Sequence, residues 1–333
     1  MKEKRYFAGA NTVNGFVSYY NEIFKPCKFI YVIKGGSGTG KSRLMREVAI
    51  FAESEGADVE YFYCSFDPES LDGIIINREL AVIDGTAPHV YEPTLPGIKE
   101  NIIDLGAFWN EGKLRESESE IRELLNDKRQ CFDLAYSYLN AVGALERVKE
   151  KISNKYIKMD EISANAAKAV SEIKPSEKGR DRVRIVSALG RKGLYCFNTF
   201  KDISTRRITL YNKFGEGYAY LEAVKKEAER FGISTTVSYH PLFPWRINAL
   251  VLGEECSLFV EESAKGSVSE AEEIDKQINA LVKKAEGCLT EASNVHFNIE
   301  SIYVSAMDFV KKESFTSDFI DKLRSSNALT NIK

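Results

Sequence analysis

Short apolar runs alternate with a helical apolar stripe in the first hundred residues, and this pattern predicts an α/β fold. Residues 29–33, 59–65 and 80–83 are short, apolar and rich in β-branched or aromatic side chains, as buried strands are. Between the first two runs, apolar residues recur at helical spacing from Leu44 to Ala52, so we expect a helix that packs on the sheet. Strands separated by helices are typical of parallel sheets.

Beyond residue 98 the pattern is helical over long distances. No proline interrupts residues 98–174, and apolar residues recur there among many charges, so we predict a long helical insertion. The pattern returns over residues 274–323, and residues 156–160 resemble residues 303–308. We therefore expect a helical hairpin appended to each of two lobes. These helices either cover the sheets or form arms that bind a protein partner, and covering is favoured for most of their length.

Composition narrows the class of protein. The 333 residues suffice for two ordinary domains, and the net charge of -3 gives no general attraction to nucleic acid or to anionic membranes. No stretch has the ~20 apolar residues of a membrane span, and no apolar segment follows the basic start, as it would in a secretory signal. The six cysteines form no CxxC pair, and three histidines are too few for a histidine-rich metal centre. We expect a cytoplasmic protein with buried free thiols.

The segment between the first strand and its helix has the spacing of a phosphate-binding loop. Residues 35–42 read GGSGTGKS, which satisfies G-x-x-x-x-G-K-[ST] in the required strand–loop–helix setting. Glycines let successive backbone N–H groups face phosphate oxygens, and the helix N-terminus adds partial positive charge. Lys41 is expected to reach the β- and γ-phosphates, and the Ser42 hydroxyl to bind Mg²⁺. The predicted nucleotide-binding residues are Gly35, Gly36, Ser37, Gly38, Thr39, Gly40, Lys41 and Ser42.

Carboxylates follow the other predicted strands. Asp84 ends the run at 80–83, and we predict that it holds Mg²⁺ together with Ser42, the alternative being that it only begins a turn. Asp67 and Glu69 follow the second strand and are candidates to orient a water molecule or to accept a substrate proton. Solvated loop carboxylates are the equally open alternative for that pair. Thr86 and His89 are further candidates for contact with the γ-phosphate.

The C-terminal half repeats the pattern of the N-terminal half. Residues 207–221 align with the first strand and the loop, with Gly215 on Gly38 and Gly217 on Gly40. In this alignment the three residues expected to do the chemistry are all lost: Tyr218 replaces Lys41, Ala219 replaces Ser42 and Val260 replaces Asp84. Alanine and valine cannot coordinate a metal, and tyrosine cannot neutralise a triphosphate. We predict two domains, residues 1–181 with an intact Walker A loop and residues 182–333 with a degenerate copy.

Basic residues of the second half allow two further hypotheses. If the two copies pack as a pseudo-dimer, an arginine of the second copy is placed to act as an arginine finger, and an ordinary surface role is the alternative for each. Basic residues also cluster at 178–184, where an interdomain linker is favoured over a nucleic-acid contact. The finger candidates are Arg184, Arg191, Arg206, Arg207 and Arg246.

Three stretches carry a resemblance to a known family. They are GGSGTGKS (35–42), CSFDPESLDGIIINRELAVIDGTAPH (64–89) and HPLFPWRINALVL (240–252). With them the chain resembles an uncharacterised bacterial family of tandem-repeat P-loop ATPases over nearly its whole length. The resemblance implies a duplicated P-loop NTPase fold and ATP binding or hydrolysis, without a settled substrate.

These observations lead to one leading functional prediction and two alternatives. The leading prediction is Mg-ATP binding and hydrolysis by the N-terminal loop, coupled to movement of the helical arms or to a partner. The first alternative is a small-molecule kinase that holds its acceptor near Asp67, Glu69 and Asp72. The second is a nucleotide sensor that binds ATP without hydrolysing it.

Overall fold

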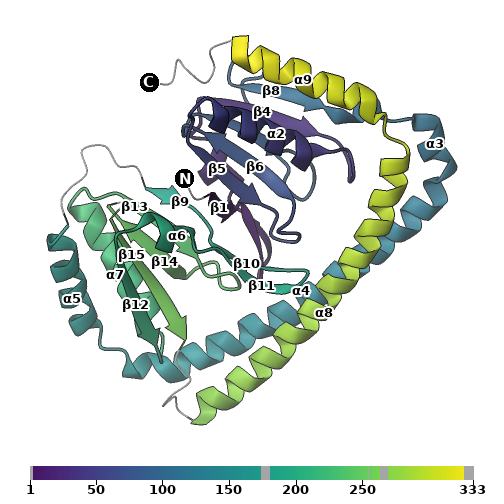
Figure 1. The fold of residues 1–333 in the computed structure, drawn as a ribbon. Helices are drawn as coiled ribbons and strands as arrows, with labels where there is room; N and C mark the ends of the chain where they lie inside the picture. The colour runs from purple at the N-terminus through teal and green to yellow at the C-terminus, as the bar shows by residue number, and fades with distance from the viewer. Residues whose placement is uncertain (1–2, 174–180, 254, 263–268, 326–333) are drawn as a thin grey trace. The chain divides into compact units, whose positions relative to one another are not determined.

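The computed structural model describes residues 3–173, 181–253, 255–262 and 269–325, which form a mixed α/β structure (Figure 1). The chain divides into two compact units. These units differ from the predicted domains 1–181 and 182–333, because each is assembled from both halves of the chain. Unit 1 contains Met1–Ala8, Ser18–Asp133 and Cys288–Lys333, and unit 2 contains Gly9–Val17 and Leu134–Gly287.

Unit 1 is built on a six-stranded sheet. Its strands are β1 (Lys4–Phe7), β4 (Phe29–Lys34), β5 (Val59–Tyr63), β6 (Leu71–Ile76), β7 (Leu80–Asp84) and β8 (Glu100–Asp104). They lie in the order β1-β5-β6-β7-β4-β8. β6 pairs antiparallel with both β5 and β7, whereas the other neighbours are parallel. The predicted parallel sheet is therefore right for three of the five pairings and wrong for the two that involve β6. Only three residues connect β6 to β7, and so short a connection joins antiparallel strands.

Unit 2 contains a five-stranded sheet in the described residues. Its strands are β9 (Arg182–Val183), β12 (Arg206–Asn212), β13 (Thr235–Tyr239), β14 (Ile247–Leu252) and β15 (Cys256–Glu262). They lie in the order β9-β13-β14-β15-β12. Two hairpins, β2 (Gly9–Thr12) with β3 (Gly15–Ser18) and β10 (Ser187–Gly190) with β11 (Gly193–Cys196), also belong here. The hairpins meet where the Asn11 side chain donates to the Leu189 carbonyl at 2.8 Å.

The two sheets repeat one another in strand order and in direction. In each, the first two strands pair parallel, the next two pairings are antiparallel and the fourth is parallel. The sheet of unit 1 has one further parallel strand, β8, beside β4. The register agrees as well, since Asp84 pairs with Ile33 and Val260 pairs with Leu210. In the predicted alignment, which places Leu210 on Ile33, Val260 thus occupies the position of Asp84 in the second sheet.

The alignment of the two loops needs a correction of one residue. The helix after the first loop is α2 (Lys41–Ser54), and the helix after the second is α7 (Glu216–Arg230). Each is followed by a glycine with positive φ, Gly56 or Gly232, which marks the same point of both copies. Counting back from these glycines shows that the second loop is one residue shorter. The replacements are then Gly217 for Lys41 and Tyr218 for Ser42, so the lysine and the hydroxyl are still lost.

Helix α2 fixes the first loop to the sheet by burying one face. Leu44, Met45 and Val48 are fully buried, and the predicted apolar stripe of this helix is confirmed. Complete burial of a side chain of this size stabilises the fold by about 1.5–3 kcal/mol. The loop therefore lies between two rigid elements, β4 and α2.

The helical prediction for residues 98–174 is wrong at its start and right for the rest that is described. β8 occupies residues 100–104 because it pairs beside β4 at the sheet edge. Residues 156–160 and 303–308 both mark the turn from a long helix to a shorter one. The remaining helices are α1 (Tyr20–Phe24), η1 (Leu105–Phe108), α3 (Glu111–Glu116), α4 (Glu118–Ser153), η2 (Asn154–Tyr156), α5 (Met159–Ser171), α6 (Thr199–Ile203), α8 (Ser269–Ser305) and α9 (Phe309–Ser325).

The two shorter helices are exchanged between the copies. α5 follows the first sheet in sequence but packs on α7 in unit 2, with Ala166 fully buried. α9 follows the second sheet but lies on α2 in unit 1 (Figure 1). There Glu313 forms an ion pair with Arg43 at 3.2 Å, and Arg324 lies over the Phe51 ring. The helical hairpins therefore do not stay with the lobes that precede them.

The structure bears on two predictions about partners, one about membranes and one about the basic cluster at 178–184. Within the described ranges, no helix combines the length and the apolarity that crossing a membrane requires. Residues 178–180 of the basic cluster lie outside the described residues.

Candidate functional site

The loop at 35–40 joins β4 to α2 with a backbone that requires glycine at two points. Gly38 has φ +71° and Gly40 has φ +81°, in the left-handed region. Gly40 is the N-cap of α2, so the first N–H groups of the helix point into the loop. Among the described residues, no backbone N–H of residues 36–40 donates to a backbone or side-chain acceptor. The loop therefore presents donors for an external anion.

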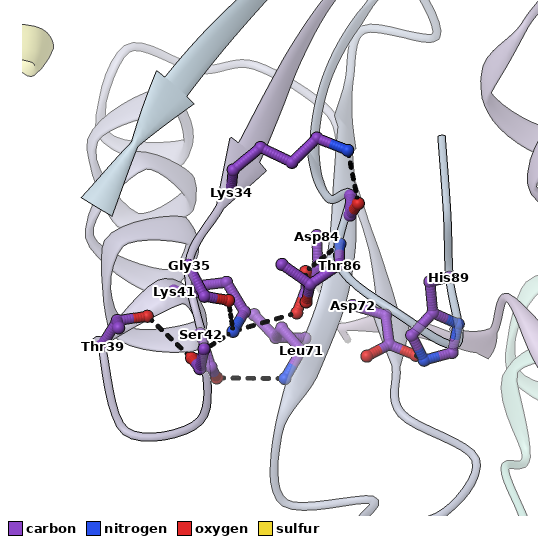
Figure 2. Close-up of polar contacts among 12 residues, drawn as sticks. Lys34, Gly35, Thr39, Lys41, Ser42, Leu71, Asp72, Asp84, Thr86 and His89 are labelled. Atoms are coloured by element: carbon purple, nitrogen blue, oxygen red, sulfur yellow. Dashed lines mark hydrogen bonds and ion pairs between the residues drawn. The ribbon is translucent and has the colours of Figure 1, made fainter. Parts of the chain in front are cut away.

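Lys41 connects the loop to the neighbouring strand. Its ammonium donates to the carbonyls of Gly35 at 2.8 Å and Gly36 at 2.7 Å (Figure 2). The same nitrogen lies 3.5 Å from Oδ2 of Asp84, at the end of β7. Both side chains are mostly buried, so their charges are poorly screened by water. The structure thus brings together two residues predicted from separate segments.

Ser42 and Asp84 each keep atoms available for a cation. The Ser42 hydroxyl accepts the N–H of Leu71 at 3.0 Å and retains a second lone pair. Oδ1 of Asp84 accepts the N–H and the hydroxyl of Thr86 at 2.8 Å and 2.5 Å, while Oδ2 faces Lys41. Thr86 therefore orients Asp84. Asp84 does begin a turn, as the alternative reading of the sequence held, and its other oxygen faces Lys41 of the loop.

A buried Asp–His pair lies beside these residues. Nε2 of His89 is 3.1 Å from Oδ2 of Asp72, and both side chains are almost fully buried (Figure 2). Burial raises the pKa of Asp72 to about 6, although the neighbouring His89 acts in the opposite direction. A carboxyl group with this pKa is ionised at neutral pH yet remains basic enough to accept a proton.

The same pair and Cys64 form a possible metal site. One ligand atom from each of Cys64, Asp72 and His89 lies within 4.8 Å of the others. Sulfur, oxygen and nitrogen together suit a borderline-soft divalent cation better than Mg²⁺. Burial also raises the pKa of the Cys64 thiol, which favours its protonated form. Mg²⁺ is better matched by the oxygen atoms of Ser42 and Asp84.

Asp67 and Glu69 occupy a turn. Oδ2 of Asp67 accepts the Ser70 hydroxyl at 3.0 Å, and its Oδ1 accepts the N–H of Glu69 at 3.3 Å. Glu69 is exposed, and its carbonyl accepts a guanidinium N–H of Arg46. These contacts are those of turn-forming residues, so they favour the structural alternative that the sequence left open for this pair.

All five arginine-finger candidates belong to unit 2. Arg246 is engaged there by two carboxylates, Glu146 at 2.7 Å and Glu150 at 2.6 Å. Arg206 lies 3.5 Å from Glu172. The carboxylates around Arg246 explain why a buried guanidinium is tolerated at that point.

The loop of unit 2 is closed by its own side chains. The Glu216 carboxylate accepts the N–H groups of Lys213 at 3.1 Å and Phe214 at 2.6 Å, and the Asn212 amide oxygen accepts the N–H of Gly217. Three N–H groups of this loop therefore already have acceptors within the chain. A cavity of about 440 Å³ adjoins this loop, lined by residues that include Lys149, Ser153, Phe214, Tyr218 and Arg246.

Three residues near the first loop escaped the sequence analysis. Lys34 donates to the Gly85 carbonyl at 2.7 Å and ties the end of β4 to the segment after Asp84. Trp109 and Lys312 contact the loop glycines, as described below. Lys312 lies on the buried face of α9 together with Thr316 and Phe319, and this burial is seen only in the packed structure.

Comparisons with known proteins give no family. No protein-family model, no curated protein and no solved structure matches this chain. The resemblance to tandem-repeat P-loop ATPases therefore stays a prediction.

Proposed function

We propose that the chain is a duplicated P-loop NTPase whose first loop binds Mg-ATP and hydrolyses it. The observation that carries the proposal is the position of the Lys41 ammonium, held between the loop carbonyls and Asp84. A lysine, a carboxylate and a set of available backbone donors meet there at the C-terminal ends of parallel strands, where α/β sheets bind ligands.

Binding would exchange internal contacts of the loop for contacts with phosphate. The N–H groups of residues 36–40 and of the N-terminus of α2 would donate hydrogen bonds to the phosphate oxygens. Lys41 would leave the carbonyls of Gly35 and Gly36 and donate to the β- and γ-phosphates. Because these carbonyls hold the ammonium in place beforehand, little side-chain entropy is lost on binding.

Ser42 and Asp84 would hold the magnesium ion. Bound Mg²⁺ would neutralise charge that develops on the phosphate oxygens. Ser42 offers a hydroxyl oxygen, and Asp84 offers the oxygen that now faces Lys41. Thr86 fixes the other oxygen of Asp84 and so sets the direction of the carboxylate.

Asp72, rather than Asp67 or Glu69, is the proposed base for the attacking water. Its carboxyl group lies at the start of β6, near enough to Lys41 and Asp84 for their charges to affect its pKa. His89 would orient the carboxylate through the 3.1 Å contact between its Nε2 and Oδ2 of Asp72. Asp72 would take the proton of the attacking water. The helix α9, which packs on α2, would then respond to the loss of the γ-phosphate by a change of position.

A kinase is the second candidate, and the same buried pair favours it. A base with a pKa of about 6 deprotonates a substrate hydroxyl as readily as it deprotonates water. In a nucleotide sensor without turnover, the third candidate, the Asp72–His89 pair would have only a structural role.

The test uses the purified full chain and two matched variants. We expect Mg-ATP to bind by calorimetry and phosphate to be released catalytically. Lys41→Ala should weaken ATP binding by at least about 100-fold, because two charge-assisted contacts are lost. Tyr218→Ala, the control in the second loop, should leave binding unchanged.

Each candidate predicts a different result. Phosphate release that needs no acceptor supports the ATPase, whereas transfer to an added small-molecule hydroxyl supports the kinase. Tight ATP binding without either product supports the sensor. Equal loss of binding in both variants, or binding that ignores Lys41, refutes the proposal.

A further inference from the structure

Two buried donors lie directly against the glycines of the first loop. A Cβ atom placed on Gly40 would lie 3.3 Å from Cε and 3.7 Å from Nζ of Lys312, which comes from α9. A Cβ on Gly36 would lie 3.2 Å from the Trp109 ring. Nζ of Lys312 and Nε1 of Trp109 are both buried, and neither has a hydrogen-bond acceptor among the described residues.

The carboxylates nearest to Lys312 are already used. Lys312 is 1% exposed, and Glu47 and Glu313 are the acidic groups close enough to affect its pKa. Arg43 contacts both, at 2.8 Å and 3.2 Å. Burial lowers the pKa of Lys312, and the positive charge of Arg43 adds to this effect. Glu47 and Glu313 oppose this effect, yet no carboxylate among the described residues accepts a hydrogen bond from the buried Lys312 amine.

The position beside Gly40 makes this burial more unfavourable still. Gly40 is the N-cap of α2, and the N-terminus of a helix repels a cation. The other exchanged helix, α5, has no buried lysine, since its buried residues are Ala166 and Val170. Packing of a helix on this surface therefore does not itself require a lysine. An anion bound by the loop would remove both penalties at once.

We propose that Lys312 is a second phosphate-binding lysine, which donates to a phosphate oxygen of the nucleotide held by residues 35–42. Trp109 Nε1 is the second donor on this rim of the loop. α9 thus carries a group of the C-terminal half into the nucleotide site of unit 1, in the place where the sequence suggested an arginine. This inference rests on the proposed nucleotide binding and adds the contact that couples phosphate to the exchanged helix.

The experiment compares Lys312→Met with Lys311→Met in the full chain. Lys311 is the matched control, because it is exposed and paired with Asp308 at 3.0 Å. We expect Lys312→Met to weaken Mg-ATP binding about 10- to 100-fold, the range for one hydrogen bond to a charged group. The same variant should raise the unfolding temperature of the nucleotide-free protein, because a buried unpaired charge is removed. Lys311→Met should change neither quantity.

A second readout uses the two tryptophans of the chain. In a Trp245→Phe background, Trp109 is the one remaining tryptophan, so ATP should change its emission. Lys312→Arg keeps the charge and should retain more of the ATP affinity than Lys312→Met does.

The outcomes separate this inference from the proposed function. Unchanged ATP affinity in Lys312→Met, with binding still dependent on Lys41, overturns the role of Lys312 alone. A lower unfolding temperature together with unchanged affinity assigns Lys312 to packing and overturns it as well. If the wild-type chain binds no nucleotide, both proposals fail.

Discussion

The loops of unit 1 and unit 2 follow corresponding strands of two sheets with the same order, yet their backbone donors meet different partners. In unit 1 the N–H groups of residues 36–40 have no acceptor among the residues that the structure describes, and Lys41 donates to two loop carbonyls. In unit 2 Glu216 and Asn212 accept the corresponding donors. The second loop therefore differs from the first in two ways: it contains an internal anion, the Glu216 carboxylate, and it lacks the lysine.

This internal anion explains how the second loop keeps its shape without a ligand. Backbone donors at a helix N-terminus need acceptors, and Glu216 at the start of α7 supplies them together with a charge that suits the helix dipole. The first loop has no such group, so its donors depend on water or on a bound anion. The two loops thus differ in whether their N–H groups have acceptors among the described residues.

The largest difference between the two loops is expected from substitution of Asp84, at the end of β7. Asp84→Ala should reduce phosphate release by about 10²–10³-fold, because a charge that acts on the transition state is lost. Val260→Ala changes the corresponding residue of unit 2 and should leave the rate unchanged. Steady-state phosphate release at several Mg²⁺ concentrations measures both, and equal losses would contradict the proposed asymmetry.

The pH dependence of turnover sharpens the role of the buried pair. A base must be ionised, so the rate should rise with pH through about 6, the pKa of Asp72. Asp72→Asn should lower the rate by about 10²-fold and remove this limb of the profile. A limb that survives the substitution would assign the base to another residue.

The same substitution has the opposite effect on stability. The folded-state pKa of Asp72 lies above the usual 3.8, so its contribution to stability is present at low pH and lost as pH rises from about 4 to 6. Asp72→Asn removes this loss and should stabilise the fold above pH 6 by up to about 3 kcal/mol. Thermal unfolding at pH 4 and pH 7.5 measures the difference, which should vanish at the lower pH.

Glycines with positive φ in the two loops give a smaller and graded effect. Gly38→Ala places a residue at φ +71° and its Cβ 2.7 Å from Val304, so it should destabilise unit 1 by about 1–2 kcal/mol or more and weaken ATP binding. Gly215→Ala has φ +106° but only an ordinary 3.4 Å contact with Ile157. It should cost stability without affecting ATP binding, as unfolding curves with and without ATP would show.

The smallest expected effect concerns the internal anion. Glu216→Ala leaves the N–H groups of Lys213 and Phe214 without their acceptor and should destabilise unit 2 by about 0.5–2 kcal/mol. It should not create a nucleotide site, because no lysine is present at the start of α7. A second ATP-binding event in this variant would show that Glu216 alone blocks the loop.

The sequence predicted the first loop well because its signal is local. Strand, glycines, lysine and helix lie within 25 residues, and the apolar stripe of α2 follows the 3.6-residue period. Asp84 was found because it directly ends a strand. Each of these features is determined by neighbours in the chain, so no tertiary contact was needed to read it.

Features set by distant contacts were missed. β8 lies in a segment that favoured helix, and it becomes a strand because β4 offers an edge to pair with. The antiparallel direction of β6 follows from the short connections to its neighbours, which the apolar pattern of the strand does not reveal. The one-residue difference between the loops was missed because the two halves were aligned without a gap. Lys312 looks like one of two adjacent lysines on a charged helix, and only the packing of α9 on α2 shows that it is buried.

The exchange of α5 and α9 makes each half of the chain incomplete by itself. A fragment ending at residue 181 would lack α9, which covers α2, and would carry α5 without α7 beneath it. A protein with a single repeat would have to associate with a second copy to cover the same surfaces. Joining two copies covalently makes that association permanent. The last helix of each half then covers a surface of the other half within one chain.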